Sequence, residues 1–152
     1  MTTALPPETT ARKRWMSVLA RASTDAIDRC LRNAPALPDH VTLRGPEVGL
    51  VMLRGRAGGG GAQFNLGEMT VTRCTVRAGG QVGHAYIAGR DAGRAELAAR
   101  IDAALQDPAL HGALHEQVIE PLAQAQDAQR QATARQAAAT RVQFFTMATM
   151  RS

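Results

Sequence analysis

Apolar side chains recur at helical spacing toward both ends of the chain and at strand-like spacing in the middle. From Trp15 to Ala22 they lie three or four residues apart, which predicts an amphipathic helix within residues 6–22. A second helix should begin at Ser23 or Thr24, because either side chain can cap it, and the prolines that follow should end it. The two helices are expected to form a hairpin that packs on a sheet.

The middle of the chain predicts strands. Val48–Arg54 is an apolar run between Pro46 and a glycine-rich stretch, which is typical of a strand buried on both faces. Residues 41–43 suit a short edge strand before it. Glu68–Arg77, rich in Thr and Val, predicts the next strand. Its faces mix apolar side chains with arginine, so we expect a β-bulge, or a face that another chain covers.

Turn and cap residues divide the remainder. Gly79–Gly80 predicts a hairpin turn, because glycine adopts positive φ without steric cost, and Val82–Ala88 returns as a third strand. Asp91 suits the N-cap of a helix that ends near Asp107, and Pro108 then begins another helix directly after that cap. The sequence therefore predicts an α+β fold with an N-terminal helical hairpin, a central, mainly antiparallel sheet of three to four strands, and C-terminal helices.

The chain length suits a single domain, residues 1–152, with about the first nine residues disordered. Residues 121–141 are largely Ala, Gln and Arg, which favours a helix with almost no large apolar side chain to bury. Phe144, Phe145 and Met147 follow it. Such a sequence predicts a tail, about residues 140–152, that docks on another protein; the alternative is that it folds back on its own sheet.

Charge and composition narrow the classes of partner. The formal net charge is +5, and nearly all of the basic charge is arginine, because Lys13 is the only lysine. The arginines are spread along the chain without interleaved aromatic residues for base stacking, so protein ranks above nucleic acid as a partner. Aromatic residues make up 3% of the chain, and a core so poor in large side chains favours completion by a partner.

Candidate metal and thiol sites are weak. Cys30 and Cys74 are far apart, with no histidine at metal-binding spacing. His111 and His115 lie one helical turn apart without a third ligand, so we predict no metal site and expect both histidines to be solvated. Cys74 is either a reactive thiol beside an arginine or a small buried residue in a strand. Without a signal segment or a run of transmembrane length, the expectation is a cytoplasmic protein with no membrane contact.

Residues 54–91 hold most of the glycines and a dense set of polar side chains. Gly58–Gly61 lacks the Lys and Ser or Thr that follow the last glycine of a phosphate loop, so we interpret it as a flexible connection. Glu68, Cys74, His84 and Tyr86 include groups suited to acid, base and nucleophile, but no motif arranges them, and no catalytic residue is predicted. The candidates for ligand or interface contacts are Arg54, Arg56, Asn65, Glu68, Arg73, His84, Tyr86 and Arg90.

Several segments, spread over nearly the whole chain, together resemble one known family. They are Arg12, Trp15–Ala20, Phe64–Cys74 (FNLGEMTVTRC), Gly83–Tyr86 (GHAY), Gly89–Asp91 (GRD) and Thr140–Met147 (TRVQFFTM). These residues resemble PhnG, a subunit of the bacterial carbon-phosphorus lyase system.

The resemblance implies a role in phosphonate catabolism. It implies a core complex with PhnH, PhnI and PhnJ, and a requirement, with PhnH, PhnI and PhnL, for transfer of ribose 5-triphosphate from ATP to an alkylphosphonate, which displaces adenine. Nucleosidase chemistry is assigned to PhnI, and the iron-sulfur cluster and S-adenosylmethionine to PhnJ, so we expect no cofactor on this chain. The resemblance thus implies an accessory, non-catalytic subunit. The alternative is a subunit that lends Arg54, Arg56, Arg73 or His84 to an anionic nucleotide or phosphonate.

Overall fold

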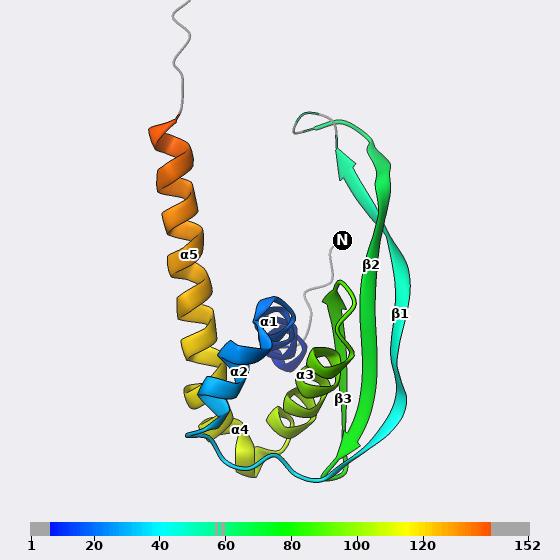
Figure 1. Cartoon of the computed structure of the whole chain (residues 1–152), viewed down its shortest axis with the longest axis vertical. Coiled ribbons are helices and arrows are strands. Elements are labelled where there is room, and N and C mark those ends of the chain that lie inside the picture. The colour runs from blue at the N-terminus through cyan, green and yellow to red at the C-terminus, as the bar shows by residue number, and fades with distance from the viewer. Residues whose placement is uncertain (1–6, 57, 59, 141–152) are drawn as a thin grey trace, which may run out of the picture.

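The computed structural model describes residues 7–140, except residues 57 and 59. Helices lie on one face of a three-stranded antiparallel sheet with the strand order β1-β2-β3 (Figure 1). The elements are α1 (Pro7–Arg21), α2 (Thr24–Leu31), β1 (His40–Arg56), β2 (Gln63–Ala78), β3 (Gln81–Ala88), α3 (Ala92–Leu105), α4 (Pro108–Leu114), the π-helical segment η1 (His115–Ile119) and α5 (Glu120–Ala139). This arrangement confirms the predicted α+β fold.

The N-terminal helical hairpin forms as the apolar spacing predicts. Trp15, Val18 and Leu19 are buried on the side of α1 that packs against α3 and β3. Ser23 caps α2, since its side-chain oxygen accepts a hydrogen bond from the backbone N–H of Ala26. Helix α1 already begins within the stretch expected to be disordered, so residues 7–9 are helical.

The prediction of a separate edge strand followed by a buried strand was wrong. Both segments belong to one strand, β1, whose side chains Val48, Leu50 and Met52 are 48%, 64% and 55% exposed. The helices cover the sheet near β3, and beyond them β1 and β2 continue as a two-stranded arm (residues 50–56 and 63–70; Figure 1). An apolar run therefore forms the strand, but no described helix lies over it.

Strand register follows the glycines and bulges. The turn Gly79–Gly80 has φ of 56° and 86°, as predicted for a hairpin. The β2-β3 register runs unbroken from Ala78 opposite Gln81 to Val71 opposite Ala88. The β1-β2 register shifts at three places, with the extra residue on β1 at two of them and at Leu66 of β2 at the third, so the bulge expected within Glu68–Arg77 does not lie on that segment.

Helix α3 lies at the centre of the core because small side chains let it approach the sheet closely. Ala95, Ala98, Ala99 and Ala103 are buried on it, and a Cβ atom on Gly83 of β3 would lie 1.9 Å from a main-chain oxygen of this helix. The side chains of residues 91 and 107 cap α3 and α4, as predicted. Helix α5 then leaves the body of the protein (Figure 1).

Candidate functional site

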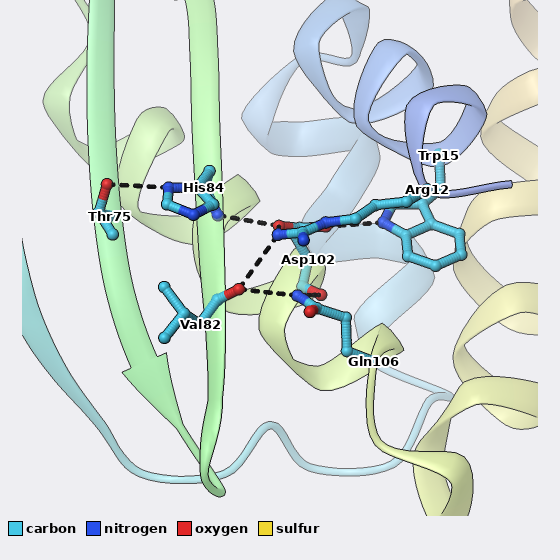
Figure 2. Close-up of polar contacts among 7 residues, drawn as sticks. All are labelled: Arg12, Trp15, Thr75, Val82, His84, Asp102 and Gln106. Carbon is cyan, nitrogen blue, oxygen red and sulfur yellow. Dashed lines mark hydrogen bonds and ion pairs between the residues drawn. The ribbon is translucent and has the colours of Figure 1, made fainter. Parts of the chain in front are cut away.

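A buried carboxylate joins the N-terminal helix to the sheet (Figure 2). Asp102, on α3, is 0% exposed. Its Oδ1 accepts hydrogen bonds from Arg12 Nε at 3.2 Å and Trp15 Nε1 at 2.8 Å. Its Oδ2 accepts from Arg12 Nη2 and from the backbone N–H of His84, both at 2.8 Å. The carboxylate thus has a cation and further donors around it, which is what burial of a charge requires.

The same network provides hydrogen-bond donors for backbone carbonyls at the outer edge of β3. The Val82 carbonyl accepts from Arg12 Nη2 at 3.1 Å and from Gln106 Nε2 at 2.8 Å (Figure 2). Farther along, the Ala88 carbonyl accepts from Arg94 Nη2 at 3.0 Å. Together with the strand N–H that donates to the buried carboxylate, these contacts occupy backbone groups that would otherwise be open to another strand.

On the other face of the sheet, polar side chains connect the three strands. Glu47 Oε1 accepts from Arg44 Nε at 2.5 Å and from Arg73 Nε at 2.6 Å, and Tyr86 lies opposite Arg73 in the register. The hydrogen bond from Arg44, then that from Arg73, lowers the pKa of Glu47. The hydrogen bond to Glu47, then that to Tyr86, raises the pKa of Arg73. Two arginines share one carboxylate, so this cluster keeps a positive charge.

The structure brings three of the predicted contact residues together. Arg73 and Tyr86 are cross-strand neighbours, and His84 lies on the same strand as Tyr86, with its Nδ1 3.1 Å from Thr75 Oγ1. Tyr86 is 56% exposed. Their shared position on an open face is compatible with contact to a partner or ligand.

The other predicted contact residues lie elsewhere. Arg54, Arg56, Asn65 and Glu68 are exposed on the arm, with Arg54 opposite Asn65, and Arg90 is exposed in the turn after β3. Within the described residues, Arg54 and Arg56 make no ion pair or side-chain hydrogen bond. The predicted set is therefore divided between the sheet, the arm and a turn rather than gathered in one site.

Cys74 is a buried strand residue rather than a reactive thiol. It is 2% exposed, and burial, followed by the negative charge of Glu96, raises the pKa of its thiol. A raised pKa lowers the thiolate fraction at neutral pH, so the reactive-thiol interpretation was wrong. Glu96 itself is 2.6 Å from His40 Nε2.

The expectation that both histidines of α4 and η1 are solvated was wrong for His111. Its Nδ1 lies 2.7 Å from the Leu105 carbonyl oxygen, and its ring meets Trp15 edge to face at a centroid distance of 5.6 Å. The turn between α3 and α4 places this ring against α1. Trp15, Gln106 and His111 line an open groove of about 830 Å³. Within residues 7–140, apart from 57 and 59, no group of three His, Cys, Asp or Glu side chains is placed to hold a metal.

Sequence reasoning missed the central residue, Asp102. A signal was present, since Asp102 stands between Ile101 and Leu105 in the apolar face of α3, where a charge needs a partner. Glu47 carried no comparable signal. Phe144, Phe145 and Met147, predicted to dock on a partner, lie outside the described residues.

Comparison with known proteins identifies the family. Residues 10–150 match the family model described as phosphonate metabolism protein PhnG. A protein of Rhizobium meliloti (strain 1021), described as α-D-ribose 1-methylphosphonate 5-triphosphate synthase subunit PhnG, is 47% identical over 140 residues, which cover 90% of this chain and 87% of the relative. In the described part of the chain, no helix has the length and apolar character needed to cross a membrane. The matched range contains both the Asp102 network and the arm, and the chain belongs to the PhnG family of phosphonate metabolism proteins.

Proposed function

We propose that this chain is an accessory, non-catalytic subunit of an α-D-ribose 1-methylphosphonate 5-triphosphate synthase, the enzyme of which its Rhizobium relative is described as a subunit. In this role it acts with PhnH, PhnI and PhnL in the transfer of ribose 5-triphosphate from ATP to an alkylphosphonate, with release of adenine. It binds PhnH, PhnI and PhnJ in a core complex and carries no cofactor of its own.

The exposed arm is the observation that supports this proposal. Leu50 is 64% exposed and Leu66 is 62% exposed, and Val48, Met52 and Phe64 are each about half exposed on the same two strands. Val48, Leu50 and Met52 share one face of β1, and exposed apolar side chains gathered in this way mark interaction sites on soluble proteins. Full burial of one such side chain contributes about 1.5–3 kcal/mol, so covering several of them would supply substantial binding energy.

The buried or hydrogen-bonded state of three reactive side chains favours a docking role over a catalytic one. Glu47 is shared by two arginines, and Asp102 accepts hydrogen bonds from a cation and two further donors. The thiol of Cys74 is buried. A general acid, base or nucleophile must reach a substrate, and these groups are occupied within the fold.

Reconstitution tests the proposal. Formation of the methylphosphonate ribose triphosphate from ATP and methylphosphonate is measured for this chain alone, for PhnH, PhnI and PhnL together, and for all four proteins. Adenine release alone would not be diagnostic, because the nucleosidase chemistry assigned to PhnI releases adenine without transfer, and we expect the transfer product only from the complete set. Turnover by this chain alone would contradict the accessory role, and undiminished activity without it would contradict the assignment as a required subunit.

A second candidate function rests on Arg54 and Arg56. Both are exposed and make no ion pair within the described residues, as expected of side chains that bind an anionic nucleotide or phosphonate. The double variant Arg54→Gln/Arg56→Gln distinguishes the two roles. A raised KM for ATP in an intact complex favours nucleotide contact, whereas weaker assembly with an unchanged KM favours docking.

A further inference from the structure

The two outer edges of the sheet differ in a way that points to a binding surface. On β3, side chains occupy the outward carbonyls of Val82 and Ala88 and the outward N–H of His84. On β1, no side chain among the described residues bonds to the backbone of the strand. A long edge strand with free backbone groups is a template for pairing with another strand.

The register identifies which strand pairs hydrogen-bond to each other. Because His84 donates its N–H away from β2, the pair His84–Thr75 is of the non-hydrogen-bonded kind, and Thr75 directs its backbone groups toward β1. Backbone groups point alternately to the two sides of a strand, so Arg73, Val71 and Met69 also direct their N–H and C=O groups toward β1.

The partners of those residues on β1 are Glu47, Gly49 and Val51, in an unbroken register. These three residues use their backbone groups to pair with β2. The N–H and C=O groups of Val48, Leu50 and Met52, which lie between and beyond them, therefore face outward. These are the same residues whose apolar side chains are exposed, all on one face of the strand.

Charge at one end of this edge indicates the chemistry of the occupant. Arg54 and Arg56 follow the outward-facing residues, and neither has an acidic partner among the described residues. At the other end, the carboxylate of Glu47 is already shared by two arginines. A segment that binds along β1 gains most if it is apolar in its middle and carries a carboxylate beside Arg54 and Arg56.

We propose that the outer edge of β1 from Val48 to Met52 is a strand-addition site for an extended segment of a partner subunit, with apolar side chains along the edge and a carboxylate beside Arg54 and Arg56. This inference rests on the proposed function, because the partner is one of the subunits of the same complex. Backbone hydrogen bonds supply affinity in such a contact, and alternate side chains supply specificity.

A proline substitution tests the edge. Leu50→Pro removes an outward N–H without removing a bond to β2, since proline is tolerated where the N–H faces solvent on an edge strand. The matched variant Leu50→Thr retains the N–H and the strand propensity but loses apolar surface. Binding to co-expressed PhnH, PhnI and PhnJ is measured by quantitative co-purification. We expect Leu50→Pro to bind at least about tenfold more weakly than wild type and more weakly than Leu50→Thr.

The possible outcomes distinguish a failure of the proposed edge site from a failure of the proposed function. Failure of the wild-type chain to bind PhnH, PhnI and PhnJ would refute the proposed function, whereas binding by Leu50→Pro within about twofold of wild type would refute only the edge site. Light scattering of the isolated chain tests whether a second copy of this chain binds at the edge instead. A dimer that Leu50→Pro dissociates would show that it does and would overturn the choice of partner.

A second variant keeps the test decisive if circular dichroism shows that Leu50→Pro is unfolded. Arg54→Glu/Arg56→Glu leaves the strand backbone intact and should weaken binding about tenfold at low salt, with a smaller loss at high salt because ions screen the repulsion. Binding unchanged at low salt would refute the proposed carboxylate contact and with it the inferred partner segment.

Discussion

Replacing Asp102 should strongly destabilise the protein. The variant Asp102→Ala leaves the Arg12 guanidinium, the Trp15 indole N–H and the N–H of His84 without their shared acceptor, at a position that is 0% exposed. The variant Asp102→Asn keeps the volume but replaces one acceptor oxygen by a donor. Either orientation of the amide then sets its NH₂ group against two donors.

The magnitude follows from burial. Removing one partner of a buried ion pair costs about 3–5 kcal/mol. Because the Arg12 side chain is 32% exposed, water can solvate part of the guanidinium, and we expect about 3 kcal/mol for Asp102→Ala. A buried donor left without an acceptor costs about 1–3 kcal/mol, so Asp102→Asn should cost about 2–3 kcal/mol. For a chain of 152 residues, a loss of about 3 kcal/mol lowers the Tm by roughly 6–12 °C.

Urea denaturation measures the free energy of unfolding directly. The fluorescence of Trp15, the single tryptophan, reports on the site itself. Asp127→Asn is the control, because that carboxylate is exposed on α5 and its loss should change stability by about 0.5 kcal/mol or less. If both Asp102 variants stay within about 1 kcal/mol of wild type, the buried carboxylate does not hold α1 to the sheet and the reasoning fails.

Three further predictions follow from packing, burial and the tail. Gly83→Ala should lower the free energy of unfolding by about 3 kcal/mol or more, because its Cβ would lie 1.9 Å from a main-chain oxygen of α3. The control Gly93→Ala, whose Cβ would meet no atom nearby, should leave stability unchanged or raise it by up to about 1 kcal/mol, and equal denaturation midpoints for the two variants would contradict this. Because burial raises the pKa of Cys74, iodoacetamide at pH 8 should alkylate the partly exposed Cys30 and leave Cys74 unmodified until pH rises further or denaturant is added, and equal rates would disprove it. Deleting the residues after Thr140 should weaken co-purification with PhnH, PhnI and PhnJ while preserving the circular dichroism; an unfolded product would place the tail in its own core, and undiminished binding would refute docking by the tail.

Local signals predicted most elements, and long-range contacts explain the rest. The caps at Ser23, Asp91 and Asp107 act within a few residues, so their positions could be read from the sequence and were confirmed. The Asp102 network joins Arg12 to a residue 90 positions away, and no local pattern encodes such a contact. Arg73, His84 and Tyr86 were separate candidates in the sequence, and the β2-β3 register, which the two-glycine turn sets, brings them together in the structure.

The segment Val48–Arg54 was predicted to be a buried strand and is an exposed one. The reason for this error connects the sequence to the proposed role. An apolar run has the same pattern whether its own chain or another protein covers it, so periodicity cannot tell the two cases apart. Of the segments that resemble the family, the fold itself accounts for Arg12, Trp15 and Gly83, which form the Asp102 network or the close contact with α3. It does not account for Phe64, 46% exposed on the arm, because an exposed phenylalanine contributes nothing to a core. An arm that is buried only in the assembly explains both the buried-strand pattern in the sequence and the exposed strand in the structure.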